Sequence, residues 1–436
     1  MSQKVIKPSI LPGFMELVPK EQILFNQMKD TIRKNYEKFG FLPIDTPVIE
    51  KSEILLAKSA GETEKQVYKV EKGSRDMSLR FDLTVPLARY VSQYYSELEF
   101  PFKRYQIGKV YRGERNQRGR FREFYQCDID IVGDRKLNII NDAEIPAIIY
   151  STFKDLGFDS FTIKINNRKI LSGFFNSLEI EDATMVLRVI DKLEKIGVEK
   201  TEEELKKLEI DDSDISKIME FISIDGSNNE ILEELKNLNI EDDEFLEGLE
   251  QLQTVVKYIK LFGVPEENFE IDLTIARGLD YYTGTVYETF LDEHKDIGSV
   301  CSGGRYDDLA SNYTKRKLPG VGISIGLTRL FFLLRDANII EPEENSLIKL
   351  LIIPMKGCLE EGVKLSNVLR GKDIRNQVYV DKAKMGKKFG YADKLDVPYA
   401  IVIGEEEIKE ELYSLRDMKT GDQEKLSTEE IIERLK

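Results

Sequence analysis

The chain has 436 residues, of which 41% are hydrophobic and 33% are charged, and its net charge is −15. This length predicts about three domains at roughly 150 residues each, and this composition excludes fibrous and disordered classes of protein. No uncharged apolar stretch approaches the ~18 residues that span a bilayer, and the N-terminus lacks the apolar core of a signal peptide. One histidine and three widely separated cysteines fit neither a disulfide framework nor a zinc site, so we expect a cytoplasmic protein that holds no metal of its own.

The net charge is distributed very unevenly along the chain. Residues 199–250 contain 19 acidic and 5 basic side chains, which accounts for nearly the whole imbalance. In contrast, residues 103–122 contain 8 basic side chains and one acidic one, and residues 370–394 contain 8 basic and 3 acidic ones. These two basic stretches are candidate anion-binding surfaces, although such runs are also typical of a solvated surface.

The N-terminal region is predicted to begin with an amphipathic helix and an extended segment. Apolar side chains recur at helical spacing over residues 20–39, and Gly40 ends the pattern. Pro43 and Pro47 then exclude a continued helix, which predicts a strand or an edge ribbon over residues 41–49.

A β-hairpin with a long basic loop is predicted next. Short β-rich runs cover residues 78–81, 106–112 and 124–132, and the last two face each other across the loop 113–119. Both strands and the loop carry arginines, whose planar guanidinium groups match phosphate oxygens, and Phe124 offers a flat face to a base. We interpret the hairpin as a nucleotide-binding element; the alternative is a basic exposed hairpin with a core phenylalanine.

The middle of the chain reads as a helical insertion in a β-rich core. Helices of three or four turns are predicted over residues 169–262, and strand-like sequence returns at 269–275 and 286–290. Within the insertion, Thr201 and Glu204 have the spacing of a capping box at a helix start.

The C-terminal region is predicted to be a separate α/β domain. A polar connection at 341–345 precedes two buried-looking strands, 348–353 and 399–403, which alternate with helical stretches and favour a parallel-type sheet. The predicted division is therefore a core domain in two parts, 1–168 and 263–340, a helical insertion, 169–262, and a C-terminal domain, 341–436.

Two further clusters place arginines where an anion could bind. Arg277 directly follows the strand at 269–275, and a buried charge needs a partner, which is either Asp280 or a ligand phosphate. The glycine-rich run 320–326 has the spacing GxGxxxG and no buried strand ahead of it, so it does not fit a dinucleotide-binding fold. It predicts instead a strand that enters a helix whose first turn carries Arg329 beside backbone N–H groups.

Together these motifs resemble the histidyl-tRNA synthetase family of class II aminoacyl-tRNA synthetases, over essentially the whole chain. The segments 20–50, 104–130 and 320–330 are similar to the three class motifs, and 277–282 and 303–307 to the two histidine-specific signatures. The segment 79–84 resembles the part that binds the substrate amino group. Its Asp82 stands where many bacterial members have glutamate, as in the archaeal and eukaryotic branch of the family.

The resemblance implies an α+β fold with an antiparallel catalytic sheet flanked by helices, an inserted helical domain and a C-terminal α/β domain that binds the anticodon. It also implies a homodimer. The implied reaction joins L-histidine and ATP, the latter with Mg²⁺ as a substrate complex, to give histidyl-adenylate and pyrophosphate. The histidyl group then moves to the 3′ end of tRNA(His).

The resemblance assigns roles to four groups of residues. The catalytic cations are Arg277 and Arg112; ATP is bound by Arg112, Glu114, Phe124 and Arg329; histidine is bound by Asp82, Thr84, Gln126, Asp130 and Tyr282; and tRNA is bound by Arg115, Gln117 and Arg118.

The chemistry of the reaction agrees with these roles. The attack of a carboxylate on the α-phosphorus brings two anions together, so a fixed guanidinium at Arg277 can neutralise the charge that grows in the transition state. A carboxylate at Asp130 and a hydroxyl at Tyr282 can together satisfy both imidazole nitrogens.

A second function of another class is also compatible with the resemblance. Non-catalytic relatives serve as regulatory subunits of ATP phosphoribosyltransferase and bind histidine without charging tRNA. Those relatives generally lack the anticodon domain and lose catalytic residues, whereas here residues 346–436 and the arginines at 112, 277 and 329 are all present. The sequence therefore favours the synthetase.

Overall fold

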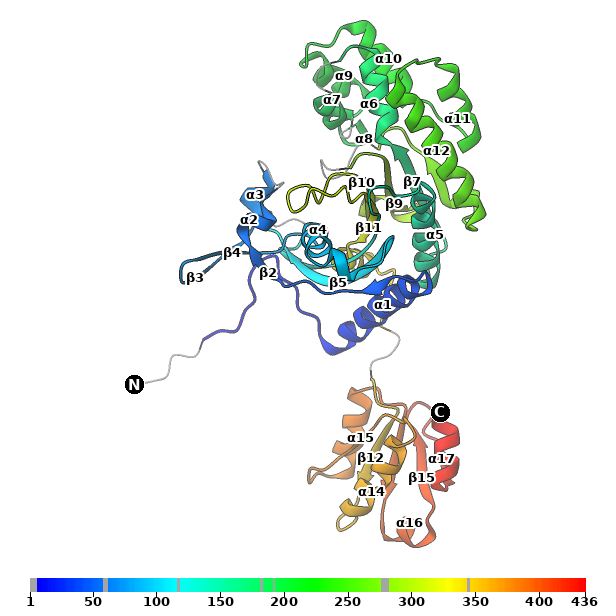
Figure 1. The fold of residues 1–436 in the computed structure, drawn as a ribbon. Coiled ribbons are helices and arrows are strands. Elements are labelled where there is room, and N and C mark those ends of the chain that lie inside the picture. Colours follow the sequence, from blue (N-terminus) through cyan, green and yellow to red (C-terminus); the bar gives the residue numbers. More distant parts are fainter. Residues whose placement is uncertain are drawn as a thin grey trace. The chain divides into compact units, whose positions relative to one another are not determined.

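The computed structural model describes residues 6–57, 62–115, 118–180, 183–190, 193–275, 282–342 and 346–436. Contacts divide the chain into two compact units, shown in Figure 1. One comprises Met1–Met15 and Met28–Ile339, and the other comprises Glu16–Gln27 and Ile340–Lys436.

The first unit is built on an eight-stranded sheet. In spatial order its strands are β1 (Leu42–Pro43), β5 (Phe102–Tyr111), β6 (Glu123–Val132), β11 (Gly320–Ile325), β10 (Cys301–Tyr306), β9 (Thr285–Leu291), β7 (Phe161–Asn167) and β8 (Phe269–Ile271). All pairs from β5 to β7 are antiparallel, as predicted, whereas the two edge pairs, β1 with β5 and β7 with β8, are parallel. The chain reaches β11 only after the helical insertion, so the sheet joins segments far apart in the sequence.

The predicted hairpin is confirmed as the β5–β6 pair. Its ten-residue strands run in continuous antiparallel register, with Arg104 opposite Asp130 and Gln106 opposite Asp128. Because side chains alternate between the faces of a strand, Gln126, Asp128 and Asp130 share one face of β6. All three are buried, which places an unusual number of polar groups at the centre of the sheet.

Helices cover the sheet of the first unit. The predicted helix at 20–39 is confirmed as α1 (Pro19–Lys38), of which residues 28–38 belong to the first unit. In this part Ile32 and Tyr36 are fully buried, and the Tyr36 hydroxyl donates to the Cys127 carbonyl on β6 at 2.9 Å. The other helices are α4 (Thr84–Gln93), α5 (Ile140–Asp155) and α13 (Leu327–Asp336). The extended segment at 41–49 forms only short strands, β1 and β2 (Ile49–Lys51).

A small three-stranded sheet extends from this core in the order β2, β4 (Arg75–Leu79), β3 (Lys69–Lys72). Two short helices, α2 (Ser52–Leu55) and α3 (Glu62–Gln66), lie between β2 and β3 in the sequence, and a 3₁₀ turn, η1 (Tyr95–Glu97), follows α4. This sheet places the segment that leads to Asp82 beside the hairpin, since the Tyr111 N–H donates to the Arg80 carbonyl at 2.9 Å.

The helical insertion leaves the sheet after β7 and returns at β8 (Figure 1). Its helices are α6 (Arg168–Ser177), α7 (Ala183–Ile190), α8 (Leu193–Ile196), α9 (Val198–Lys206), α10 (Asp212–Ile222), α11 (Asn228–Asn237) and α12 (Asp243–Leu261). Two glycines allow α6 and α12 to touch, because a Cβ on Gly173 would lie 2.3 Å from the Phe245 nitrogen and one on Gly248 would lie 2.7 Å from the Ile170 nitrogen.

The predicted capping box at Thr201 is wrong. Helix α9 begins at Val198 after Gly197, so Thr201 lies inside the helix and its hydroxyl donates to the Gly197 carbonyl at 2.9 Å. Capping boxes occur instead at Ser227 with Glu230 and at Ser427 with Glu430, which have the same spacing.

The second unit contains a five-stranded mixed sheet. Its order is β13 (Asn376–Val378), β12 (Leu350–Pro354), β14 (Tyr399–Ile403), β15 (Tyr413–Asp417) and β16 (Gln423–Leu426). The predicted parallel pairing holds for β13, β12 and β14, but β15 and β16 are antiparallel because they follow β14 through short connections. The helices are α14 (Leu359–Arg370), α15 (Met385–Lys394), α16 (Glu405–Glu410) and α17 (Thr428–Leu435).

Two 3₁₀ turns complete the first unit, and a buried ion pair fixes the segment 303–307, which resembles the second histidine-specific signature. The turns η2 (Glu266–Asn268) and η3 (Asp292–Ile297) flank β8 and β9. Arg305 on β10 forms a buried ion pair with Asp142 on α5: its Nε donates to Oδ1 at 2.9 Å and its Nη2 to Oδ2 at 2.6 Å. The arginine of the 303–307 signature therefore ties a strand to a helix.

This ion pair predicts a stability effect. Arg305→Ala would leave the Asp142 carboxylate buried without its partner and should lower the free energy of unfolding by about 3–5 kcal/mol. Arg33→Ala, which removes an exposed ion pair with Glu37 at 2.8 Å, is the matched control and should change stability little. Urea unfolding of both variants measures the difference, and equal effects would contradict a structural role for Arg305.

Candidate active site

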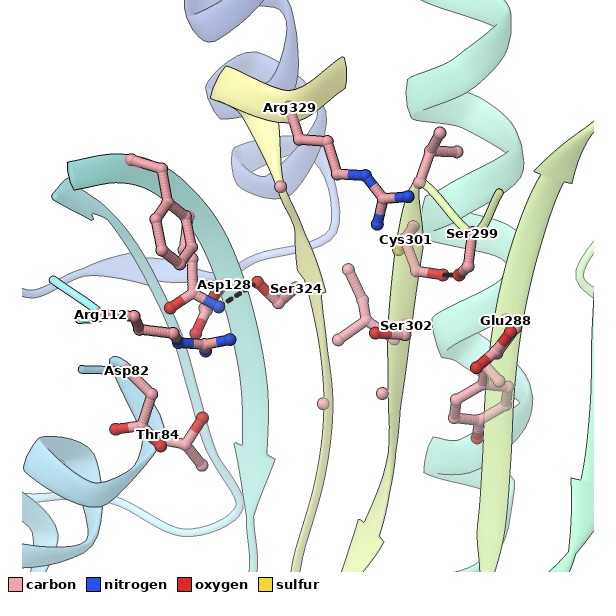
Figure 2. A pocket seen from close by; sticks show the side chains of 18 of the residues that line it. Asp82, Thr84, Arg112, Asp128, Glu288, Ser299, Cys301, Ser302, Ser324 and Arg329 are labelled. Carbon is pink, nitrogen blue, oxygen red and sulfur yellow. Dashed lines mark hydrogen bonds between the residues drawn. The ribbon is translucent and has the colours of Figure 1, made fainter. Parts of the chain in front are cut away.

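A cavity of about 500 Å³ opens over the β6 side of the large sheet (Figure 2). Its walls come from the residues before α4, from the β5–β6 hairpin, from β9, β10 and β11, and from the start of α13. Nine side chains predicted from the sequence line it: Asp82, Thr84, Arg112, Glu114, Phe124, Gln126, Asp130, Tyr282 and Arg329. Arg115 and Arg118 are exposed on the hairpin loop and do not line it, and Gln117 and Arg277 lie outside the described residues.

Asp82 lies just before α4, and its carboxylate is aimed into the cavity (Figure 2). Its Oδ1 accepts the Val85 N–H at 3.1 Å, so the helix start fixes the side chain. Within the part of the chain that the structure describes, its Oδ2 is buried without a hydrogen-bond partner. Burial raises the pKa of Asp82 to about 6, partly offset by the Val85 hydrogen bond and by the nearby charge of Arg112.

Asp130 has the most firmly fixed carboxylate in the cavity. Arg104, which is fully buried on β5, lies opposite it with Nη2 2.5 Å from Oδ2, and the Tyr306 hydroxyl donates to Oδ1 at 2.9 Å. Burial raises the pKa of Asp130 to about 7 in spite of Arg104. Two partners from neighbouring strands therefore hold this acceptor in one orientation.

Gln126 and Asp128 lie on the same face of β6, nearer the hairpin loop. Gln126 Nε2 donates to the Ser324 hydroxyl on β11 at 2.9 Å (Figure 2). Asp128 also lines the cavity, and burial raises its pKa to about 6, with Arg104 and a hydrogen bond to Ser324 acting in the opposite direction. The sequence interpretation gave no role to Asp128 or Arg104. Alternation along β6 places Asp128 on the same face as Gln126 and Asp130, whereas Arg104 is identified only by its register opposite Asp130.

The cavity is also lined by cationic and aromatic side chains. The guanidinium carbon of Arg112 lies 5.2 Å from the ring centroid of Phe124, and Arg112 Nε donates to the Phe81 carbonyl at 3.0 Å. Arg329 projects from the first turn of α13, with Nη2 donating to the Ile297 carbonyl at 2.8 Å, and burial lowers its pKa. Figure 2 shows the two guanidinium groups on different walls of the cavity, and planar guanidinium groups match phosphate oxygens.

The hairpin loop is attached to the end of α13. Arg118 Nε donates to the Asp336 carboxylate at 2.8 Å, and Nη2 contacts the same oxygen. Glu114, which lines the cavity, accepts from Arg120 at 3.2 Å. Arg118 therefore ties the loop to α13, and its neighbours Gly119 and Arg120 line the cavity.

Within the described ranges, no group of three or more His, Cys, Asp or Glu side chains could hold a metal ion. The carboxylates of Glu114 and Glu288 line the cavity and are suited to supply one or two oxygens to a magnesium ion that arrives on nucleotide phosphates. No helix among the same residues is long and apolar enough to cross a membrane.

Because the pKa of Asp82 is raised, replacing this residue by asparagine should stabilise the protein, and the gain should be larger at high pH. A carboxyl whose pKa is higher in the folded state than in the unfolded state loses stability as pH rises between the two values. Asp82→Asn keeps an acceptor for Val85 and stays neutral, so its free energy of unfolding should exceed that of the wild type by on the order of 1–3 kcal/mol at pH 8. Urea unfolding should show a smaller gain at pH 5, and a less stable variant at pH 8 would contradict the burial argument.

Sequence comparisons agree with this geometry. A family model described as histidyl-tRNA synthetase matches residues 13–330, and one described as an anticodon binding domain matches residues 349–436. A protein of Clostridium tetani named histidine–tRNA ligase is 62% identical over 437 residues and covers 100% of both chains. Because this relative is bacterial, Asp82 alone does not assign the chain to the archaeal and eukaryotic branch.

Structural comparisons give the same result. The crystal structure of histidyl-tRNA synthetase from Nostoc sp. PCC 7120 is 41% identical, with a TM-score of 0.91 over 99% of this chain and 100% of that one. A Bacillus halodurans structure described as an ATP phosphoribosyltransferase regulatory subunit/histidyl-tRNA synthetase shares the fold, with a TM-score of 0.75 at 20% identity over 90% and 97% of the two chains. From the family match and the two close relatives, the chain belongs to the histidyl-tRNA synthetase family.

Proposed function

We infer that this chain is a histidine–tRNA ligase that activates L-histidine with ATP and transfers the histidyl group to the 3′ end of tRNA(His). The observation that carries the inference is the polarity of the cavity. Guanidinium groups and an aromatic ring line the same cavity as buried carboxylates. A site of this kind can hold an anionic nucleotide and a cationic amino acid with their reactive groups facing each other.

At the nucleotide end, we assign adenine to the Phe124 ring, the α-phosphate to Arg112 and the γ-phosphate to Arg329. Glu114 completes the ATP site, and Mg²⁺ enters with the nucleotide. The histidine carboxylate attacks the α-phosphorus, a new P–O bond forms, and the bond to pyrophosphate breaks with its electron pair. No proton transfer is needed, so fixed positive charge is the main requirement of this step, and we assign it to Arg112 and Arg277.

At the histidine end, we assign the imidazole to Asp130 and Tyr282 and the ammonium to Asp82, Thr84 and Gln126. The Arg104 and Tyr306 contacts of Asp130 support this assignment, because an acceptor with a fixed orientation can reject a side chain that offers no N–H. A ligand without that donor would leave a buried carboxylate oxygen unmatched.

We adopt the domain division predicted from the sequence, with a catalytic domain in two parts, 1–168 and 263–340, a helical insertion, 169–262, and an anticodon-binding domain, 341–436. On these domains we assign tRNA to two surfaces. The hairpin loop, with Arg115, Gln117 and Arg118, is suited to the acceptor end. In the C-terminal unit the stretch 370–394 includes α15 and its N-cap residue, Lys384. Lys384 and Lys387 are exposed, whereas Lys388 is buried and donates to the Pro354 carbonyl at 2.9 Å. We also propose a homodimer, as the family resemblance implies, and a cytoplasmic location, where charged tRNA is used.

Histidine-dependent exchange between ATP and pyrophosphate tests this function directly. We expect exchange that requires L-histidine and charging of tRNA(His) by the same preparation. The regulatory-subunit alternative predicts histidine binding without exchange, and the presence of Arg112 and Arg329 in the cavity argues against it. A folded preparation that binds histidine and shows no exchange would overturn the ligase assignment.

The catalytic role of Arg277 gives a separate prediction. Arg277→Gln should lower the single-turnover rate of adenylate formation by roughly 10²–10³ while ATP and histidine affinities change only a few fold, since the lost contact is made in the transition state. Arg277→Lys should recover part of the rate, because an ammonium supplies charge without the planar fork. Thermal stability of the same preparations is the control, and a stable Gln variant with unimpaired rate would remove Arg277 from the mechanism.

A further inference from the structure

Three buried acceptor atoms in the cavity have no hydrogen-bond partner among the described residues. They are Oδ2 of Asp82, Oε1 of Gln126 and Oδ1 of Asp128. All three residues line the cavity, and their exposed fractions are 2%, 9% and 2%. A buried acceptor left unsatisfied costs on the order of 1–3 kcal/mol, more if it is charged, so the arrangement is matched to a ligand that donates hydrogen bonds.

Neighbouring contacts leave one oxygen of Asp128 available to a ligand. Ser324, its register partner on β11, accepts from Gln126 Nε2 at 2.9 Å, so its hydroxyl orients Gln126, and it lowers the pKa of the neighbouring Asp128 carboxylate. Gln106, its register partner on β5, donates instead to Asp45 at 2.9 Å and to Thr46 at 3.1 Å. The strands on both sides of β6 therefore leave Oδ1 of Asp128 unoccupied.

The three acceptors match a primary ammonium group in number and charge. An –NH₃⁺ group has three N–H donors and no acceptor, and it carries the positive charge that two buried carboxylates need. Asp82 and Asp128 lie close enough for the charge of Asp128 to raise the pKa of Asp82, so a cation between them would relieve this repulsion. In Figure 2 the side chains of Asp82 and Asp128 lie on the same side of the cavity as Arg112. An ammonium group held by the two carboxylates would therefore lie on the side of the cavity where Arg112 is assigned to phosphate.

We propose that Asp128 is a histidine-binding residue, whose Oδ1 accepts an N–H of the substrate α-ammonium together with Asp82 Oδ2 and Gln126 Oε1. This proposal rests on the proposed function and adds a second carboxylate to the ammonium site. It also gives Ser324 a positioning role, because its hydroxyl holds the Gln126 amide in the orientation that leaves Oε1 free for the ligand.

The proposal is tested with Asp128→Asn and two ligands that differ only in the amino group. These are L-histidine and 3-(imidazol-4-yl)propanoate, with Kd measured by calorimetry. Loss of one charge-assisted hydrogen bond should weaken histidine binding by about 10–100-fold. Binding of the analogue and the KM for ATP should change by less than about threefold, so the preference for histidine over the analogue falls by the same factor as histidine affinity.

Asp134→Asn is the matched control, because Oδ1 of Asp134 is also buried without a partner but the residue does not line the cavity. This control should leave histidine affinity unchanged. Equal losses for both ligands in Asp128→Asn, or unchanged histidine affinity, would overturn the proposal. If wild-type protein shows histidine-dependent exchange while the ligand preference of Asp128→Asn is unaltered, only the Asp128 inference fails.

A second variant keeps the test decisive if Asp128→Asn does not fold. Ser324→Ala removes the hydroxyl that lies beside Asp128 on β11 and orients Gln126, while retaining all three acceptors. It should therefore weaken histidine binding several fold and leave the analogue unaffected. The urea midpoint of each variant is measured at pH 8. A purely structural role for Asp128 predicts a lower midpoint with parallel losses for both ligands, whereas a ligand-binding role predicts a midpoint that is unchanged or higher.

Discussion

Burial of carboxylates at the centre of the large sheet is the constraint on which the rest of the site depends. Asp82, Asp128 and Asp130 are each at most 3% exposed, and burial raises the pKa of all three. Arg104 offsets part of this cost because it lies fully buried opposite Asp130. The buried negative charge that Arg104 does not offset lowers the stability of the free protein, and a cationic ligand would remove this cost. Active sites commonly give up stability in this way to gain binding.

The scaffold explains how such groups stay in place. The hairpin is joined to the β11–α13 segment by the Tyr125 N–H, which donates to the Thr328 hydroxyl at 2.8 Å, and by the contact between Gln126 and Ser324. Gly322 makes room for the site, because a Cβ there would lie 2.4 Å from the Asp130 carboxylate and 2.3 Å from the Ile129 carbonyl. The glycines that resemble a dinucleotide fingerprint thus allow close strand packing around a carboxylate.

Much of this architecture is predictable from local patterns. The hairpin, α1 and the strand–helix unit with Arg329 follow from periodicity and from proline and glycine positions, and the structure confirms them. The contributions of Arg104 and Asp128 depend on strand register, which sequence periodicity does not specify. Thr201 shows another limit, since a capping-box pattern also occurs inside a helix that begins one turn earlier.

Long-range pairing accounts for the other differences. The partner of Arg305 is Asp142, a residue 163 positions away, and Tyr306 meets Asp130 across 176 positions. No local pattern identifies such contacts, so the second histidine-like signature could be recognised from sequence but its structural function could not. The antiparallel β15–β16 pair is instead a local hairpin joined by residues 418–422, which the predicted parallel-type sheet did not include.

A crystal structure of the protein with L-histidine bound tests the central claim most directly. The account predicts the imidazole beside Asp130 and Tyr282 and the ammonium nitrogen within about 3 Å of oxygens from Asp82, Gln126 and Asp128. Histidine bound with its ammonium away from these carboxylates, or outside the cavity, would contradict the account.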